Sequence, residues 1–292
     1  MLCLLLRVDP TVSDISVSIV TPSFNQAEYI EDTILSVKRQ DYDNIHHIIM
    51  DGGSTDGTLE ILKKYESTYN MTWVSQPDDG QADAINQGFE RANGNVLGWL
   101  NSDDVYITNS AISTQIDALS EYPDADIVNG RGIRLKENGK WDHPIKRRDH
   151  KLSHSGLKEI ASVLQPATLW YDYVWKNIDI DESLIYTFDW DFFIRATESY
   201  NIVPIPDFLI GYRWQGDNKT TEGGLERAEE IRDITGQYLG KTSWQYQLLC
   251  IYCGVYRASG ILPDAVGDRV EDVLTFVSNV VSYLTLKQIS GV

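Results

Sequence analysis

The segment 99–106, WLNSDDVY, follows an apolar run and carries two adjacent carboxylates. The run NVLGWL (95–100) is typical of a buried strand. A buried strand that ends in Asp103 and Asp104 is costly unless a cation or hydrogen-bond donors stabilise the charges. Two interpretations follow: the carboxylates bind a divalent metal that carries a diphosphate, or they cap the next helix. Taken alone, the segment slightly favours the cap.

Upstream of this segment, apolar runs alternate with amphipathic helical patterns. The expected strands are 15–21, 45–50, 71–75 and 95–100, and the expected helices are 26–40, 58–69 and 81–92. This alternation predicts an α/β fold with a mostly parallel sheet flanked by helices. Polar or glycine-containing corners follow the strands at 22–25, 51–56, 78–83 and 101–104. Because ligands bind beyond the carboxyl ends of such strands, we expect a Rossmann-like ligand-binding half over 15–106.

Charge and the absence of two glycine motifs narrow the class of ligand. The chain has 43 acidic and 25 basic residues, a formal net charge of -18, which argues against a nucleic-acid partner. Neither G-x-G-x-x-G nor G-x-x-x-x-G-K occurs in the sequence, which argues against a dinucleotide dehydrogenase or a P-loop enzyme. An acidic protein that binds an acidic nucleotide needs a bridging cation, so the metal interpretation gains support.

The second half of the sequence mixes short strands with helices and ends in a helical region. We expect a helix over 108–121, strands over 127–129 and 168–171, a hairpin that turns at 137–139, and a helix within 186–199. The basic patch KRRDHK (146–151) is either a solvated loop or a lid that contacts an anionic acceptor. Three more helices are expected at 222–239, 243–258 and 264–286.

These patterns divide the chain into an N-terminal extension (1–14), an α/β domain (15–220, with halves 15–106 and 107–220) and a helical C-terminal extension (221–292). Three cysteines are too few for a disulfide framework. No apolar run reaches the roughly 18 residues of a membrane span, so we expect a cytoplasmic protein. The apolar last helix either packs on the domain or contacts a second subunit or the cytoplasmic face of a membrane.

Five sequence motifs stand in the order seen in one enzyme family. They are SIVTPSFNQAEYIEDTILSV (18–37), DGGSTDGT (51–58), QPDDGQADAINQGFERANGNVLGWLNSDDVY (76–106), QPATLWY (165–171) and DWDFFIR (189–195). Over residues 16–219 the chain resembles the family 2 glycosyltransferases with the GT-A fold. The resemblance implies transfer of a sugar from a nucleotide donor, usually a UDP-sugar, with inversion at the anomeric carbon. It also implies a divalent metal, Mn²⁺ or Mg²⁺.

The resemblance places donor-binding residues at the strand ends. They are Pro22, Asn25, Asp51, Gly53, Asp83, Asn86, Asn101 and Ser102. Asp51 is expected to accept a hydrogen bond from the base edge, and Gly53 lets the backbone approach the donor because it lacks a Cβ. Asp83 and Asn86 would line the ribose or the donor sugar. Alternatively, Asp83 is the N-cap of a helix and Asn86 is an amide on the helix surface.

The segment WLNSDD corresponds to the metal-binding D-x-D motif of the family. Asp103 is the residue expected to hold the metal on the diphosphate, with Asp104 in support. Asn101 stands where the first acid of the motif would be. Gln215 stands where relatives often place a metal-binding histidine, so the metal dependence implied by the resemblance rests mainly on Asp103.

A general base must remove the proton of the acceptor hydroxyl. The acidic motif of the family points to Asp189 as this base and to Asp191 as the second choice. Partial desolvation beside Trp190 would raise the pKa of such a carboxylate. Asp191 has the alternative of a helix cap or an ion pair with Arg195. Gln165 resembles the acceptor-side residue of the family, and we place Trp190 on the same side.

The expected activity is therefore the addition of one sugar to a glycan or a lipid-linked glycan. A processive synthase is disfavoured because the sequence has no Q-x-x-R-W signature. The alternative, suggested by Asn101 and Gln215, is a non-catalytic paralogue that binds nucleotide sugars.

Overall fold

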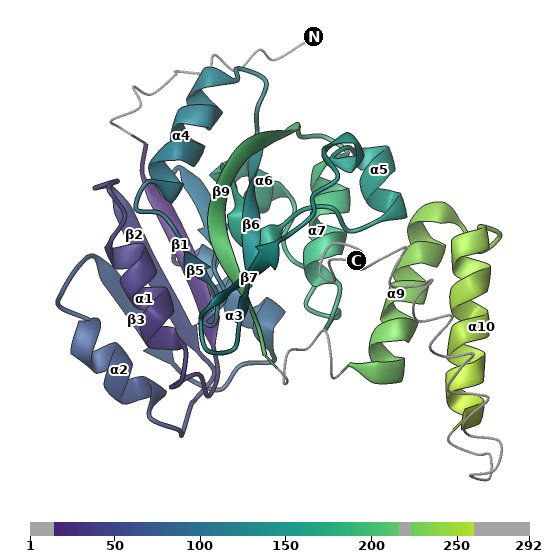
Figure 1. The fold of residues 1–292 in the computed structure, drawn as a ribbon, viewed down its shortest axis with the longest axis horizontal. Helices are drawn as coiled ribbons and strands as arrows, with labels where there is room; N and C mark the ends of the chain where they lie inside the picture. Colours follow the sequence, from purple (N-terminus) through teal and green to yellow (C-terminus); the bar gives the residue numbers. More distant parts are fainter. Residues whose placement is uncertain (1–14, 216–222, 260–292) are drawn as a thin grey trace.

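The computed structural model describes residues 15–215 and 223–259. These residues form a nine-stranded sheet in the order β3-β2-β1-β4-β8-β6-β9-β5, with β7 paired to β6. Helices flank this curved sheet, and two C-terminal helices stand beside one end of it (Figure 1). The expected extension 1–14 and the expected helix 264–286 lie outside the described residues, so the predicted membrane or subunit contact of that helix stays a prediction.

The N-terminal half alternates strands and helices as predicted. Its strands are β1 (Val17–Ser23), β2 (Ile45–Asp51), β3 (Met71–Ser75) and β4 (Val96–Trp99), and its helices are α1 (Ile30–Lys38), α2 (Thr58–Tyr65) and α3 (Gln81–Glu90). All pairings within this group of strands are parallel. Every residue of the central strand β1 is buried, which explains its β-branched, apolar sequence. The carboxyl ends of these strands therefore lie on one edge of the sheet.

The second half of the sheet is mixed. β8 (Thr168–Tyr171) pairs antiparallel with both β4 and β6 (Ile127–Lys136). β7 (Trp141–Pro144) forms the expected hairpin with β6. β9 (Ile202–Trp214) runs parallel to β6, and near its end it pairs antiparallel with β5 (Val105–Tyr106). The parallel arrangement expected from the sequence thus holds for the first four strands, and antiparallel pairs complete the sheet.

The long strand β9 was not expected from the sequence, because Pro204 and Pro206 interrupt its apolar pattern. The register between β6 and β9 shifts next to these prolines, between Asn129 and Arg131. The guanidinium of Arg147 donates hydrogen bonds to the main-chain carbonyls of Asn129 and Ile205 at this irregularity. The Arg147 side chain is only 3% exposed. This residue of the basic patch 146–151 is therefore part of the core, and neither of the two interpretations of the patch describes it.

Helices of the second half cover the sheet and then extend beyond it. They are α4 (Ala111–Glu121), α5 (His154–Glu159), α6 (Asp172–Asn177), α7 (Phe188–Ala196), α9 (Gly224–Leu239) and α10 (Trp244–Ser259), with 3-10 turns η2 (Asp149–Lys151) and η3 (Gln165–Ala167). Ile231 and Ile234 of α9 belong to the same buried cluster as Phe188 and Trp190 of α7. Within the described ranges, no helix is both long enough and apolar enough to traverse a bilayer.

An aromatic cluster links α3, β4, β8 and α7 beneath the carboxyl edge of the sheet. The ring of Phe89 lies 6.2 Å from that of Trp99 and 5.7 Å from that of Trp170, both edge-on. Trp170 in turn lies 5.4 Å from Phe192. Buried aromatic pairs of this kind contribute both area and favourable ring geometry.

We expect Phe89→Ala to lower the free energy of unfolding by about 3–5 kcal/mol, because it leaves a cavity between the two tryptophans. Urea unfolding followed by tryptophan fluorescence measures this loss. Trp141→Ala serves as the control, since Trp141 is 60% exposed and its removal should change stability by roughly 0.5 kcal/mol or less. Equal losses in the two variants would contradict the role of the cluster.

Candidate functional site

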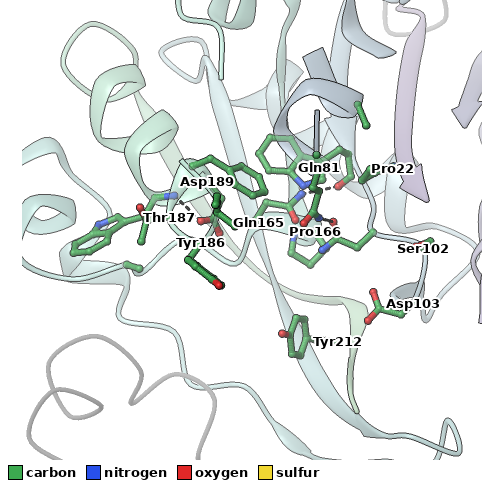
Figure 2. Close-up of a pocket in the computed structure, with 18 of the residues that line it drawn as sticks. Pro22, Gln81, Ser102, Asp103, Gln165, Pro166, Tyr186, Thr187, Asp189 and Tyr212 are labelled. Atoms are coloured by element: carbon green, nitrogen blue, oxygen red, sulfur yellow. Dashed lines mark hydrogen bonds between the residues drawn. The ribbon is translucent and has the colours of Figure 1, made fainter. Parts of the chain in front are cut away.

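A cavity of about 580 Å³ opens beyond the carboxyl ends of β1 and β4. Its opposite wall is formed by the segment that leads into α7 and by the first turns of α9. Figure 2 shows Ser102 and Asp103 on one side and Tyr186 and Asp189 on the other, with Gln165 and Pro166 between them. The size is typical of small-molecule sites. The predicted site residues that line the cavity are Pro22, Asn101, Ser102, Asp103, Gln165, Asp189 and Trp190.

The other predicted residues lie outside the cavity lining. They are Asn25, Asp51, Gly53, Asp83, Asn86, Asp104 and Asp191. Asp51 organises the loop after β2: its carboxylate accepts hydrogen bonds from the main-chain N–H of Gly53 (3.1 Å) and Ser54 (2.9 Å) and from the hydroxyl of Ser75 (2.7 Å). The φ angle of Gly53 is 87°, which favours glycine there for conformational reasons.

Asn25 fixes the neighbouring loop after β1. Its φ angle of 51° places it in the left-handed region, which asparagine tolerates better than most residues. Its side-chain oxygen accepts a hydrogen bond from the main-chain N–H of Thr55 (2.9 Å). Asn25, Asp51 and Gly53 thus hold two adjoining loops in shape at the edge of the cavity.

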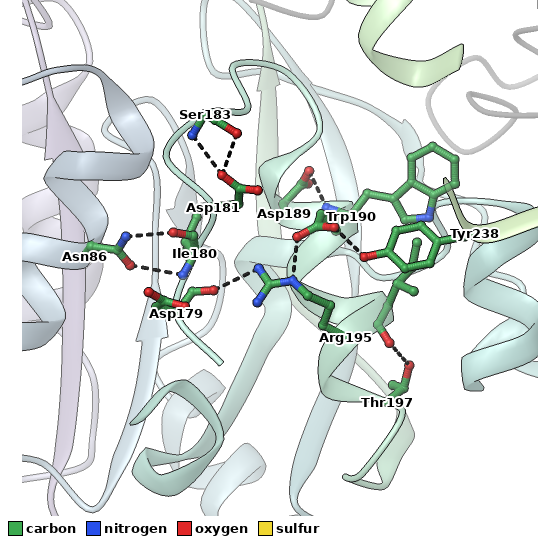
Figure 3. Close-up of polar contacts among 12 residues, drawn as sticks. Asn86, Asp179, Ile180, Asp181, Ser183, Asp189, Trp190, Arg195, Thr197 and Tyr238 are labelled. Atoms are coloured by element: carbon green, nitrogen blue, oxygen red, sulfur yellow. Dashed lines mark hydrogen bonds and ion pairs between the residues drawn. The ribbon is translucent and has the colours of Figure 1, made fainter. Parts of the chain in front are cut away.

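Asp83 and Asn86 are used within the fold. Asp83 accepts hydrogen bonds from the main-chain N–H of Asp79 (2.9 Å) and from the side chain of Gln87. The amide of Asn86 pairs with both the carbonyl (2.9 Å) and the N–H (3.2 Å) of Ile180 (Figure 3). The structure brings neither residue into the cavity, and the alternatives expected for them were also wrong. Gly80 is the N-cap of α3, and Asn86 is buried against Ile180 and does not lie on the helix surface.

The two carboxylates of WLNSDDVY face different surroundings. Asp104 is fully buried, and its carboxylate accepts hydrogen bonds from the main-chain N–H of Arg213 (3.0 Å) and from the side chain of Asn101 (3.3 Å). The guanidinium of Arg213 donates to the main-chain carbonyl of Asp103 (3.0 Å) and to the carboxylate of Asp32 (2.9 Å). Asp104 therefore anchors the end of β4 to β9, and Asp103 is left in the cavity wall.

Asp103 is one of the carboxylates in the cavity wall that could hold a cation. Burial raises its pKa, and the side-chain amide of Gln215 donates a hydrogen bond to it (2.8 Å). Asn101 and Gln215 add amide groups to the same side of the cavity, and oxygen donors of these kinds suit Mg²⁺ or Mn²⁺. Among the described residues, no group of three or more acidic, histidine or cysteine side chains could hold a metal. The residues present therefore fit a metal that takes most of its remaining ligands from the diphosphate and water.

Asp189 lies at the start of α7 on the opposite side of the cavity. One of its carboxylate oxygens accepts a hydrogen bond from the N–H of Trp190 (2.7 Å), and burial raises the pKa of Asp189. The indole N–H of Trp190 donates to the carbonyl of Leu157 (2.6 Å), which fixes the ring beside the carboxylate. A half-buried carboxylate with a raised pKa in a cavity wall is chemically suited to accept a proton.

Asp191 is held inside the fold instead. It is 3% exposed, and its carboxylate pairs with Arg195 (2.6 Å) and accepts a hydrogen bond from the hydroxyl of Tyr238 (2.5 Å). The structure therefore separates the two acids of DWD, with Asp189 in the cavity and Asp191 bound to its neighbours.

Several cavity residues were not expected from the sequence. They are Asp78, Gln81, Tyr186, Tyr212 and Arg227. Asp78 stands in the polar corner 78–83, which was a usable signal. Arg227 is a single basic residue in an otherwise ordinary amphipathic helix, so no pattern in the sequence marks it.

Helix α9 also fixes the segment that precedes Asp189. The carboxylate of Glu230 accepts hydrogen bonds from the main-chain N–H groups of Ile185 (2.9 Å), Tyr186 (2.7 Å) and Thr187 (2.6 Å). It also accepts one from the hydroxyl of Thr187 (2.7 Å). The N-cap residue Thr187 makes no side-chain capping hydrogen bond to α7. Glu230 of another helix instead binds the N–H groups of the three residues that lead into α7, and so fixes the approach to this helix start.

We expect Glu230→Ala to lower the free energy of unfolding by about 2–3 kcal/mol, because it leaves main-chain N–H groups without an acceptor. Glu229→Ala is the matched control on the same helix, since Glu229 pairs with Arg257 at the surface and should cost less than about 1 kcal/mol. Thermal and urea unfolding of the two variants test this difference. Equal stability of both variants would show that the contact does not hold the helix start.

Comparison with known proteins identifies the family of this chain. A family model described as "Glycosyl transferase family 2" matches residues 18–173. An uncharacterized glycosyltransferase of Rickettsia typhi is 28% identical over 240 residues, which cover 80% of this chain and 74% of the relative.

Two solved structures share the fold. TarS of S. aureus in complex with UDP-GlcNAc has a TM-score of 0.61 at 18% identity, with 92% of this chain and 91% of that chain covered. The mannosyltransferase PcManGT of Pyrobaculum calidifontis, in complex with GDP-Man and Mn²⁺, has a TM-score of 0.63 at 14% identity, with 92% and 83% covered. These likenesses confirm the predicted α/β fold of the GT-A type. The family model spans more than half of the chain, including the strands that end at the cavity, and the chain belongs to glycosyltransferase family 2.

Proposed function

We propose that this glycosyltransferase moves one sugar from a UDP-sugar to a hydroxyl of a glycan or lipid-linked glycan, with inversion at the anomeric carbon. The observation that carries the proposal is the placement of two acids on opposite sides of one cavity. Asp103 lies at the end of β4, and Asp189 lies at the start of α7 (Figure 2). A donor between them would place its diphosphate leaving group near Asp103 and its anomeric carbon toward the side of Asp189.

The donor side is formed by the ends of β1 and β4. Pro22, Asn101 and Ser102 line it together with Asp103. The fold neighbours TarS and PcManGT bind UDP-GlcNAc and GDP-Man, which supports a nucleotide sugar as the donor class. Mn²⁺ or Mg²⁺ bound at Asp103 would stabilise the negative charge that develops on the leaving diphosphate.

The acceptor side is formed by Asp189, Trp190 and Gln165. Asp189 removes the proton from the acceptor hydroxyl while the hydroxyl oxygen forms the new bond to the anomeric carbon. The bond between the anomeric carbon and the diphosphate breaks on the opposite face of the sugar. The hydrogen bond from Gln165 to the carbonyl of Trp99 (2.7 Å) keeps this wall in register with the end of β4. Because burial raises the pKa of Asp189, the rate should fall when the pH is lowered through a value above the ordinary aspartate pKa of about 3.9.

A non-catalytic paralogue remains the second candidate, since Asn101 and Gln215 replace residues expected in the family. The half-buried Asp189 carboxylate in the cavity wall favours catalysis, because a carboxylate with a raised pKa is of use as a base and donor binding alone does not require one there. UDP release from a labelled UDP-sugar, with or without an acceptor, separates the two candidates.

For Asp189→Asn, we expect unchanged binding of the UDP-sugar and a roughly 10²–10⁴-fold loss of turnover, because the amide cannot accept the proton. Asp191→Asn should lose less than about tenfold, since Asp191 is outside the cavity. Donor binding by calorimetry and UDP release measure the two effects. A wild-type rate in Asp189→Asn together with a large loss in Asp191→Asn would assign the base to Asp191 instead.

For Asp103→Asn, we expect the loss of the manganese-dependent part of UDP binding. Ligand at 100 times its dissociation constant stabilises a protein by about 2.7 kcal/mol, so a thermal-shift assay with UDP, with and without Mn²⁺, detects the change. Asp117→Asn is the control, because Asp117 is an exposed acid on α4. An unchanged manganese-dependent shift in Asp103→Asn would place the metal elsewhere.

A further inference from the structure

Helix α9 brings a positive charge into the acceptor side of the cavity. Arg227 lies in the first turn of α9, three residues before Glu230, and it lines the cavity. Its charge acts on Asp189, and Asp189 in turn acts on Arg227. Arg227 is the only lysine, arginine or histidine among the described residues that line the cavity.

Arg227 differs from the other arginines of the C-terminal helices in its partners. Arg232 pairs with Asp233 (2.7 Å), and Arg257 pairs with Glu229. Within 15–215 and 223–259, the guanidinium of Arg227 has no hydrogen bond or ion pair, and its interactions with Asp189, Tyr212, Tyr252 and Glu230 act at longer range. The carboxylate of Glu230 is already occupied by the N–H groups before α7.

The guanidinium of Arg227 is half-buried in the cavity wall, and burial lowers its pKa. A cation that has lost part of its hydration is stabilised when an anion pairs with it. An arginine fork binds carboxylate and phosphate groups in a two-point geometry. A ligand that places such a group against Arg227 would therefore be favoured.

The donor diphosphate is not the best candidate for that group. Asp103, at the end of β4, is the acid assigned to the metal and the diphosphate, whereas Arg227 interacts with Asp189. Figure 2 shows Asp103 and Asp189 on different sides of the cavity. An anion at Arg227 would thus belong to the molecule whose hydroxyl Asp189 activates.

We propose that Arg227 binds a negatively charged group, a carboxylate or a phosphate, on the acceptor. The inference rests on the proposed function, because it takes Asp189 as the base. It gives the C-terminal helix α9 a part in substrate selection: Glu230 positions the segment before Asp189, and Arg227 selects acceptors that carry a charge near the reacting hydroxyl.

Two pairs of small probes test this proposal. Methyl β-D-glucuronide is compared with methyl β-D-glucoside, and glycerol 3-phosphate with glycerol, each titrated into the full chain with and without saturating UDP and Mn²⁺. The variants are Arg227→Gln, Arg227→Lys and, as the matched control on the same helix, Arg232→Gln. Calorimetry or ligand-observed NMR gives the affinities, and the two anionic probes separate a carboxylate from a phosphate.

We expect at least one anionic probe to bind the wild-type chain about tenfold or more tightly than its neutral twin. Arg227→Gln should lose this preference, Arg227→Lys should keep part of it, and Arg232→Gln should keep it in full, with UDP binding unchanged in all three. The proposal is overturned if the wild-type chain shows no preference for charge, if Arg227→Gln retains it, or if Arg227→Gln weakens UDP binding instead. A chain that binds no UDP-sugar would refute the proposed function, whereas UDP-sugar binding without a charge preference would refute only the role of Arg227.

Discussion

The buried guanidinium of Arg213 is the contact on which the site depends, because it joins the ends of two strands that are far apart in sequence. It donates to the carbonyl of Asp103 and to the carboxylate of Asp32, and the main-chain N–H of Arg213 binds Asp104. The strand β9 is thereby locked to the corner after β4. Of the two adjacent acids in that corner, the fold uses Asp104, and Asp103 is left to face the cavity. The helix-cap interpretation of the acidic pair was wrong for Asp104, whose carboxylate binds the main chain of β9 and the side chain of Asn101. The metal interpretation stays a prediction for Asp103.

The opposite wall of the cavity depends on a contact of the same kind. The Glu230 carboxylate from α9 holds the N–H groups of residues 185–187, and Tyr238 of the same helix holds Asp191. Asp189 is left half-buried in the cavity wall. In both walls, one acid is held by hydrogen bonds within the fold, and a nearby acid lines the cavity.

The sequence was sufficient for features that depend on local pattern. The alternation of β-branched runs with helical spacing located the first four strands, and parallel strands carry their polar corners to one edge, so Asp103 and Pro22 were predicted to share a site. Contacts between distant segments were beyond such patterns. The prolines of β9 break the sequence pattern from which a strand would have been predicted. The position of Asn86 in α3 gives no sign that its amide binds the main chain of Ile180. Nothing in the sequence of α9 marks Arg227 as a cavity residue.

The most direct test of the central claim is a crystal structure of the chain grown with UDP and Mn²⁺, with anomalous data collected for manganese. The claim is that Asp103 and Asp189 lie on opposite sides of one cavity, which holds both the donor and the acceptor. It predicts an anomalous peak beside the Asp103 carboxylate and the diphosphate of UDP next to that peak. The β-phosphate, which carries the sugar in the donor, should face the side of the cavity where Asp189 lies. Manganese away from Asp103, or UDP bound outside this cavity, would contradict it.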